Sequence, residues 1–218
     1  MRSDVLGVVL AGGQSLRYGS DKAFATLGGV SLVRRSARAL EPATGRVVLV
    51  ANEIEKHEAA GLPIRPDLVP GVGPLGGIHT AVAWAREEGL RGAIVLACDM
   101  PFVPPSLVGH LADCLDQRGV VVPASYGPRG FEPLCAAYGV DALPAIEAAI
   151  RRGDRAVVSF FSDVDVRVAD LSTVSRFGDP DMMFFNVNRP EDHLRAETLL
   201  SGEAMAEEPD GAANPEGK

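Results

Sequence analysis

Two cations in a glycine-rich segment near the N-terminus are the first residues whose types and spacing suggest chemistry. Arg17 and Lys22 follow the apolar run 5–11, and glycines surround them. The glycines are Gly12, Gly13 and Gly19. Glycine lets a backbone turn sharply and aim its N–H groups at a ligand, and positive charge beyond a buried strand favours a phosphorylated one, here a triphosphate. The alternative is a plain turn with two solvated cations.

The spacing of these glycines matches neither of the two common nucleotide-binding loops. The P-loop pattern G-x-x-x-x-G-K-[ST] fails, and so does the dinucleotide pattern G-x-G-x-x-G. We therefore expect neither a P-loop kinase nor a dehydrogenase.

One carboxylate stands at the end of a second apolar run. Asp99 directly follows the run 92–98, which predicts a buried strand. The carboxyl ends of such strands border the ligand crevice in α/β sheets, so this side chain could hold Mg²⁺ against nucleotide phosphates. The alternative is that Asp99 caps a helix beginning near Pro104 or Pro105.

Two further polar residues point to the same crevice. Asn52 follows the apolar run 46–51, and Asp67 opens a stretch rich in glycine and proline. A helical pattern follows that stretch, and the N-terminus of a helix favours anions. The alternatives are that Asn52 caps the segment 54–60 and that Asp67 stabilises a turn.

Apolar runs and helical patterns alternate along the chain, which is typical of an α/β domain with a mostly parallel central sheet. Buried strands are predicted at 5–11, 46–51, 92–98 and 120–124, and an edge strand at 164–168. Helices are predicted after an N-cap at Ser31, from residue 78, and at 105–115, 142–150 and 155–161. The expected fold is a three-layer, Rossmann-like α/β/α domain over 1–200, with a disordered acidic tail at 201–218.

Length, composition and charge limit the kinds of function. The 218 residues are 46% hydrophobic without an apolar run of about 18 residues, and the start is too short for a signal peptide, so we expect a soluble cytoplasmic protein. The net charge is −8 without a basic stripe, which argues for a small ligand and against nucleic acid. Three cysteines lack disulfide or zinc spacing and are expected to be buried thiols: Cys98, Cys114 and Cys135.

Four motifs together resemble those of the molybdenum cofactor guanylyltransferases, relatives of the sugar nucleotidyltransferases. The first is L-A-G-G-x-S-x-R-x-G-x-D-K-A from Leu10, with Tyr18 where the family usually has Met. The others are D-x-x-P-G-x-G-P-L-G-G-I-x-x-A from Asp67, C-D-M-P-F around Asp99, and F-x-N-x-N-x-P-E-[DE] from Phe184. They occur in the family's order, and the resemblance spans residues 5 to about 200.

This resemblance implies a nucleotidyltransferase that moves GMP from GTP to the phosphate of the molybdopterin cofactor (Mo-MPT) with Mg²⁺ and releases pyrophosphate. The residues it implies for catalysis are Arg17, Lys22 and Asp99. Those it implies for GTP binding are Leu10, Ala11, Gly12, Gly13, Lys22, Asn52, Asp67 and Asp99. The implied metal ligands are Asp99 and Asn188, although Asn188 equally suits a cap before Pro190. Transient contact with molybdenum insertion proteins or molybdoenzyme chaperones is a further expectation.

Two alternatives to this function stay open. The molybdopterin cytidylyltransferases of the same fold carry L-A-A-G in place of L-A-G-G, and the missing methyl group at Gly12 leaves room for a purine, so we expect GTP to be preferred. A non-catalytic nucleotide sensor is the other alternative, and the joint presence of Arg17, Lys22 and Asp99 argues against it. The turn 125–132 resembles the family's acceptor side, while a solvated hairpin explains its glycines and proline equally well.

Overall fold

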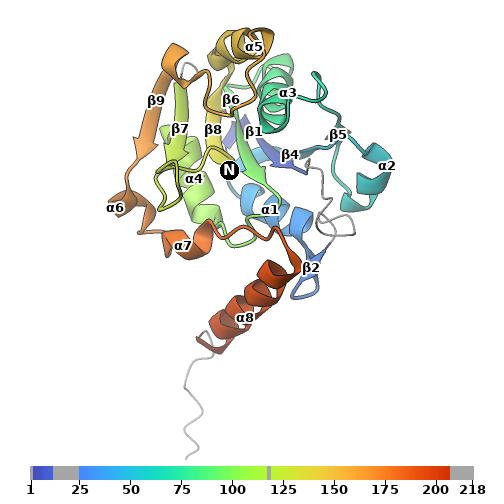
Figure 1. Ribbon diagram of the computed structural model, residues 1–218, viewed down its shortest axis with the longest axis vertical. Helices are drawn as coiled ribbons and strands as arrows, with labels where there is room; N and C mark the ends of the chain where they lie inside the picture. The colour runs from blue at the N-terminus through green and yellow to red at the C-terminus, as the bar shows by residue number, and fades with distance from the viewer. Residues whose placement is uncertain (1, 12–24, 117–118, 207–218) are drawn as a thin grey trace, which may run out of the picture.

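A seven-stranded sheet forms the middle layer of the protein, whose computed structural model describes residues 2–11, 25–116 and 119–206 (Figure 1). The strands are β1 (Arg2–Leu10), β4 (Thr44–Val50), β5 (Ile64–Arg65), β6 (Gly92–Ala97), β7 (Gly119–Pro123), β8 (Cys135–Gly139) and β9 (Asp165–Ala169). Their order across the sheet is β5-β4-β1-β6-β8-β7-β9. Neighbours are parallel except at β8, which runs antiparallel to β6 and β7. The prediction of a mostly parallel sheet is confirmed.

Helices cover both faces of the sheet and complete the three layers (Figure 1). One face carries α1 (Leu32–Leu40) and α4 (Pro105–Cys114), and the other carries α3 (Pro74–Glu87) and α5 (Leu143–Arg151). In β1, Val5 and Val9 pack toward the first pair of helices, whereas Leu6 and Val8 pack toward the second. Side chains alternate between the two faces of a strand, so a strand covered on both faces must be apolar throughout. This arrangement explains the continuous apolar runs.

Two local predictions at the ends of elements are confirmed. Ser31 caps α1, because its Oγ accepts a hydrogen bond from Arg34 N at 3.3 Å. A cap of this kind satisfies one of the N–H groups that the first helical turn leaves without a partner. β9 is the last strand of the sheet and is largely exposed, as its alternating sequence indicates.

The remaining elements are short. They are α2 (Ile54–His57), α6 (Leu171–Val174), α7 (Pro180–Met183), the 3-10 helices η2 (Glu58–Ala60), η3 (Val140–Ala142) and η4 (Phe161–Asp163), and the hairpin strands β2 (Thr26–Leu27) and β3 (Val30–Ser31). The helix predicted at 155–161 is wrong, since that segment forms turns before η4 begins. Two β-branched residues, Val157 and Val158, disfavour a helix there, and Phe160 is buried against Tyr138 with ring centroids 6.3 Å apart.

The C-terminal helix α8 (Pro190–Ala206) leaves the layers and projects from the lower end of the molecule in Figure 1. Its first half is attached to the β2–β3 hairpin, where Gly28 N donates a hydrogen bond to Glu197 Oε1 at 3.0 Å. Residues 201–206 are helical, although the sequence predicts a tail without regular structure from 201. Extending an existing helix adds one hydrogen bond per residue, so polar composition alone does not stop it. Residues 207–218 lie outside the described part.

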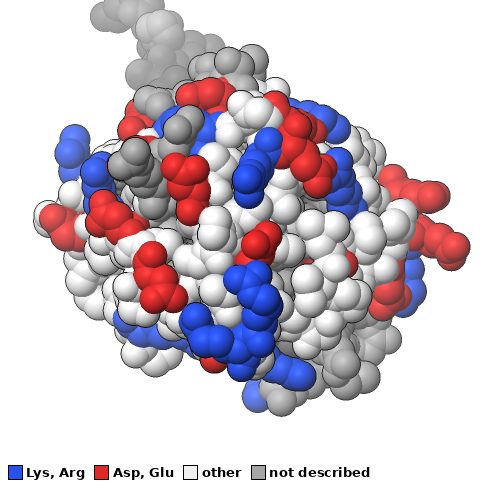
Figure 2. Space-filling model, turned by 90° about the horizontal axis from the view of Figure 1, so that it is seen from above, with Lys and Arg blue, Asp and Glu red and all other residues white. Residues whose placement is uncertain are grey.

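The surface of the described residues carries both signs of charge. Figure 2 looks onto the end of the molecule at which β6 and β9 begin, and basic and acidic side chains are interspersed there. Several basic side chains gather at the lower centre of this view, and acidic side chains lie around them. In the ranges that the structure describes, no helix is both long and apolar enough to cross a membrane.

Candidate active site

The carboxyl ends of β4, β1 and β6 lie side by side and form the floor of the candidate site. Ala11 N donates a hydrogen bond to Val50 O, and Cys98 N donates one to Leu10 O, both at 3.0 Å. Leu10 and Ala11 are buried at the end of β1. The segments that follow the three strands therefore begin at one edge of the sheet, the usual ligand edge of an α/β fold.

The loop that follows Ala11 carries four of the predicted site residues. They are Gly12, Gly13, Arg17 and Lys22, and all four lie outside the described residues. Ala11, the last described residue before this segment, lies at the end of β1, and β1 lies between β4 and β6. Ala11 is thus between the ends of the two strands that lead to Asn52 and Asp99.

Asn52 and Asp67 hydrogen-bond to each other twice. Asn52 Nδ2 donates to Asp67 Oδ2 at 2.9 Å, and Asp67 N donates to Asn52 Oδ1 at 2.9 Å. Glu53, not Asn52, is the N-cap of α2, and its side chain makes no capping hydrogen bond, so the expectation of an Asn52 cap is wrong. Two residues predicted separately as nucleotide ligands form one two-point contact, which ties the loop from Asp67 to the end of β4.

The carboxylate of Asp67 also lies against the first turn of α3. A Cβ atom added to Gly77 would lie 3.8 Å from Asp67 Oδ1 and 3.2 Å from Leu10 Cδ2, and one added to Gly76 would lie 3.1 Å from Val69 O. The two glycines let the helix approach both the loop and the end of β1 closely. The Asp67 side chain therefore lies beside the N-terminal turn of a helix, where the helix dipole presents its positive end.

Thr80 is a supporting residue that the sequence does not reveal. Its Oγ1 accepts a hydrogen bond from Leu68 N at 2.9 Å and donates one to Gly76 O at 2.9 Å. This buried hydroxyl joins the loop after Asp67 to the helix below it. In the sequence, Thr80 is one polar residue within an apolar helical pattern, and only the fold shows what it contacts.

Asp99 lies two residues beyond β6 and is half-buried. Its backbone oxygen accepts a hydrogen bond from Val187 N at 2.9 Å, which brings the segment before α8, and with it Asn188, to the end of β6. The N-cap of α4 is Pro104, and no side chain makes a capping hydrogen bond there, so the expectation that Asp99 caps this helix is wrong. The structure thus joins the two predicted metal ligands through the backbone.

The first turn of α8 is capped from within. Asp192 Oδ2 accepts hydrogen bonds from Asn188 N at 2.9 Å and from Arg189 N at 2.8 Å. A carboxylate at a helix N-terminus satisfies free N–H groups and complements the helix dipole. This cap fixes the backbone at Asn188 next to the candidate site.

The donor set of Asp99 and Asn188 suits Mg²⁺. A carboxylate and an amide supply oxygen atoms, the ligands that hard divalent cations prefer. No group of three or more His, Cys, Asp or Glu side chains placed to bind a metal occurs in the described part of the chain. Mg²⁺ commonly takes only one or two protein carboxylates and completes its shell with water and phosphate oxygens, so the sparse set fits a cation shared with a nucleotide.

Glu132 is an acidic neighbour of Asp99 that the sequence does not identify. Leu96 pairs with Cys135 in the antiparallel β6–β8 ladder, and continuing that register places Asp99 opposite Glu132. Ser125 Oγ donates a hydrogen bond to Glu132 Oε1 at 2.9 Å. Burial raises the pKa of Glu132 and the charge of Asp99 raises it further, while the Ser125 hydrogen bond and Arg129 lower it. The β7–β8 connection therefore borders the site.

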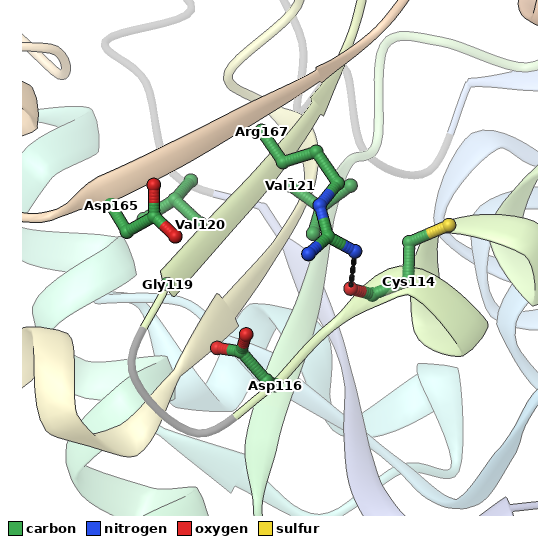
Figure 3. Close-up of a pocket in the computed structure, with 7 residues that line it drawn as sticks. All are labelled: Cys114, Asp116, Gly119, Val120, Val121, Asp165 and Arg167. Carbon is green, nitrogen blue, oxygen red and sulfur yellow. Dashed lines mark hydrogen bonds between the residues drawn. The ribbon is translucent and has the colours of Figure 1, made fainter.

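A small pocket at the opposite end of the sheet is unrelated to this site. Figure 3 shows it between the starts of β7 and β9 and the end of α4, with Arg167 Nη1 donating a hydrogen bond to Cys114 O at 2.9 Å. A cation beside the last carbonyl groups of a helix stabilises that terminus. Arg167 therefore has a structural explanation, and the pocket contains none of the predicted site residues.

Comparisons with known proteins agree with the geometry. Residues 7–168 match the family model described as a MobA-like NTP transferase domain. A probable molybdenum cofactor guanylyltransferase of Pelotomaculum thermopropionicum is 34% identical over 88% of this chain and 92% of its own, and a molybdenum cofactor guanylyltransferase of Rhodobacter capsulatus is 33% identical over 90% and 96%. The crystal structure of molybdopterin-guanine dinucleotide biosynthesis protein A from Archaeoglobus fulgidus superposes with a TM-score of 0.73 at 28% identity, covering 90% of this chain and 99% of that one.

Proposed function

The chain belongs to the MobA-like NTP transferase family, and from that premise we propose that it transfers GMP from GTP to the phosphate of the molybdopterin cofactor and releases pyrophosphate. The observation that carries the proposal is the placement of the Asn52–Asp67 pair and Asp99 beyond the strands on either side of β1. A nucleotide bound across the end of β1 would have its base beside the pair and its phosphates beside Asp99. The relatives of this chain in Pelotomaculum thermopropionicum and Rhodobacter capsulatus are named as a probable molybdenum cofactor guanylyltransferase and a molybdenum cofactor guanylyltransferase.

The reaction needs alignment and charge compensation, and no side-chain nucleophile. An oxygen of the acceptor phosphate forms a bond to the α-phosphorus of GTP, while the bond from that phosphorus to the bridging oxygen breaks. The electron pair and the negative charge leave with pyrophosphate. Arg17 and Lys22 of the glycine-rich loop would neutralise that charge, and binding both substrates at one strand edge lowers the entropic cost of their encounter.

Asp99 and Asn188 would hold Mg²⁺ at the phosphates. When bound there, the cation would supply positive charge to the α-phosphate and to the departing pyrophosphate. Asp99 is suited to this role because it lies at the strand edge and makes no cap for α4. Asn188 is brought there by the hydrogen bond between Val187 N and Asp99 O.

Asp67 would select guanine. Its carboxylate accepts hydrogen bonds, and the guanine edge offers adjacent N–H groups that cytosine lacks. Asn52 Nδ2 donates a hydrogen bond to Asp67 Oδ2, and Asn52 Oδ1 accepts one from Asp67 N, so the carboxylate and its backbone are both held before the base arrives. Leu10, Ala11, Gly12 and Gly13 would line the same side, with the absent side chain at Gly12 leaving space for a purine.

Pyrophosphate release from each of the four nucleoside triphosphates, with and without Mo-MPT, tests the proposal. We expect release that requires the acceptor and Mg²⁺ and is fastest with GTP. A clear preference for CTP would instead support a molybdopterin cytidylyltransferase. Binding of GTP without release from any triphosphate would support a nucleotide sensor.

The setting of the reaction is part of the proposal. Cys98, Cys114 and Cys135, all within the described residues, form no disulfide, which suits the reducing cytoplasm, where we place the reaction. Transient contact with molybdenum insertion proteins or molybdoenzyme chaperones would pass the product on. Mixing the purified protein with such a partner and measuring product transfer would test this step.

A further inference from the structure

β9 forms one edge of the seven-stranded sheet, and its outer side carries no strand in the part of the chain that the structure describes (Figure 1). On its inner side it pairs in parallel with β7, from Asp165 opposite Gly119 to Ala169 opposite Pro123. Val164, just before β9, is also extended, with a φ of −138° and a ψ of 163°. The backbone over 164–169 therefore presents an edge to which another strand can add.

The opposite edge of the sheet is protected by comparison. β5 has only two residues, and very short edge strands offer few groups for pairing. The side chain of Arg65 in β5 forms an ion pair with Glu87, and its guanidinium carbon lies 4.2 Å from the centroid of the Trp84 ring. Of the two edges of this described sheet, β9 is thus the one suited to pairing with a further strand.

The hydrogen bonds to β7 show which backbone groups of β9 point outward. Ala124 N donates a hydrogen bond to Ala169 O at 2.8 Å, so the backbone groups of Ala169 point toward β7. In an extended strand the N–H and C=O groups of one residue point to the same side, and those of the next residue point to the other side. The odd-numbered residues of β9 therefore bond to β7. The residues whose backbone groups point outward are Val164, Val166 and Val168.

The charged side chains of β9 lie together on one face of the sheet. Asp165 and Arg167 are two positions apart, both are exposed, and both border the pocket beside the end of α4 (Figure 3). Arg167 uses Nη1 for its hydrogen bond to Cys114 O, and a guanidinium group has further N–H donors for a carboxylate. On the other face, Val168 is 48% exposed.

The alternation of these charges favours one register for two antiparallel copies of β9. In the register centred on Val166, Asp165 of each copy lies opposite Arg167 of the other, and the outward groups of the valines face one another. The neighbouring registers that also join the outward groups are centred on Asp165 or on Arg167, and each places two like charges opposite each other, which is destabilising. Charged side chains on an edge strand usually oppose pairing, but here they are complementary to a second copy of the same strand.

We propose that two copies of this chain associate through β9 in the register centred on Val166, so that the two sheets become continuous across a two-fold axis. The two Val166 residues exchange backbone hydrogen bonds, and so does each pair of Val164 with Val168 of the second copy. An Asp165–Arg167 ion pair lies on each side of the axis. β8 and β7 separate β9 from β6, so the contact leaves the candidate active site of each copy open, and the inference does not depend on the proposed function.

Sedimentation velocity of the full 218-residue chain over about 5–500 μM protein measures the dimer Kd. Pairing through one short strand buries a small area, so we expect reversible dimers within this range. Asp165→Arg should raise the dimer Kd at least about ten-fold, because it places arginines opposite each other on both sides of the axis. Adding Arg167→Asp to this variant exchanges the charges within each pair and should return the Kd to within about three-fold of the wild-type value.

Two further variants separate pairing from a general change in the protein. Val168→Pro removes an outward N–H group and leaves the hydrogen bonds to β7 in place, so the monomer should stay folded while the dimer Kd rises at least about ten-fold. Glu55→Arg reverses a charge at an exposed position of α2, on the β5 side of the sheet, and should leave the dimer Kd unchanged (Figure 1). Urea unfolding at low protein concentration checks that each monomer is intact.

Three results would overturn the proposal. The first is a wild-type chain that sediments as a 22.9 kDa monomer at every concentration. The second is a dimer whose Kd is raised by neither Asp165→Arg nor Val168→Pro, which would place the contact on another surface. The third is a double variant, Asp165→Arg with Arg167→Asp, that dimerises as weakly as Asp165→Arg alone, which would exclude the register.

Discussion

Asp67 and Asp99 are both carboxylates at the ligand edge, yet their surroundings suit them to different tasks. Asp67 is fixed by the Asn52 amide group and lies against the first turn of α3, so its oxygens are aligned hydrogen-bond acceptors. Asp99 lies beyond the central strand β6, beside Glu132 and the backbone that leads to Asn188. Negative charge gathered in this way favours a cation. This difference in surroundings is the reason that Asp67 is proposed to bind the base and Asp99 to bind Mg²⁺.

Asp99→Asn should lose activity because an amide oxygen is a weaker ligand than a carboxylate for Mg²⁺. We expect kcat to fall by roughly a hundred-fold or more at limiting Mg²⁺, with partial recovery at high Mg²⁺, and we expect EDTA to abolish wild-type activity. A titration of initial rate against Mg²⁺ concentration measures this. Asp141→Asn, at an exposed position, is the control. Wild-type Mg²⁺ dependence in Asp99→Asn would remove Asp99 from the metal site.

Asn52→Ala should weaken base selection by releasing Asp67. The hydrogen bond to Asp67 Oδ2 and the one from Asp67 N are both lost, and the carboxylate can then turn away from the proposed position of the base. We expect the ratio of kcat/KM for GTP to that for CTP to fall about ten-fold, the worth of one charge-assisted hydrogen bond. Thr198→Ala, which removes an exposed hydrogen bond within α8, should leave the ratio unchanged. An unchanged ratio in Asn52→Ala would mean that the pair serves only the fold.

At the scale of elements, the strands and helices that carry long apolar patterns were predicted well from the sequence, and the 3-10 helices and the segment 155–161 were not. The buried strands and main helices follow from their own side chains, since a strand covered on both faces has few alternatives. The 3-10 helices owe their shape to neighbours, and the segment 155–161 forms turns because Phe160 is buried against Tyr138. Asn52 and Asp67 are each found from their strand or loop, but their mutual contact requires the packing of α3 beneath the loop. Glu132 is found only from the antiparallel register of β8.

Gly76→Ala should disturb the loop that α3 supports. The new Cβ would lie 3.1 Å from Val69 O, a backbone atom that can retreat only if the loop shifts. We expect GTP affinity to fall several-fold. Gly109→Ala in α4 is the matched control, because nothing lies within 4 Å of the added Cβ, and it should raise the free energy of unfolding by about 0.5–1 kcal/mol. Isothermal titration with GTP and urea unfolding of both variants measure the contrast, and equal GTP affinities would contradict it.

His79 on α3 should make stability depend on pH. Burial lowers the pKa of His79 below its ordinary value of 6.5, although Glu147 and Asp67 oppose this shift. The unfolded chain therefore binds a proton near pH 6.5 that the folded protein binds only at lower pH, so stability falls as the pH drops below 6.5. His79→Gln should lose less stability than the wild type between pH 7 and pH 5.5. Urea unfolding across this range measures the difference, and parallel pH profiles would refute it.

At the scale of the whole molecule, one edge of one sheet unites segments that are far apart in the chain. The Asn52–Asp67 pair, Asp99 and the β7–β8 connection lie along β4, β1, β6, β8 and β7, and the backbone before α8 reaches this edge through the hydrogen bond from Val187 N to Asp99 O. The sequence predicts a three-layer fold and the return of its last motif to the site. The strand order could not be predicted, because apolar runs carry no information on which strands become neighbours. The hairpin considered at 125–132 does agree with the antiparallel pairing of β7 and β8. The strand order places the Asn52–Asp67 pair and Asp99 beyond the strands on either side of β1.

The fate of labelled phosphorus tests the central claim most directly. GTP labelled at either its α- or its γ-phosphate is incubated with the protein, Mg²⁺ and Mo-MPT, and the products are separated. The account predicts that the α-label moves into the pterin product in equal amount to the γ-label released as pyrophosphate. A γ-label on the acceptor would show kinase chemistry, and an α-label that stays with GTP while the nucleotide is bound would show that no transfer occurs; either result would contradict the account.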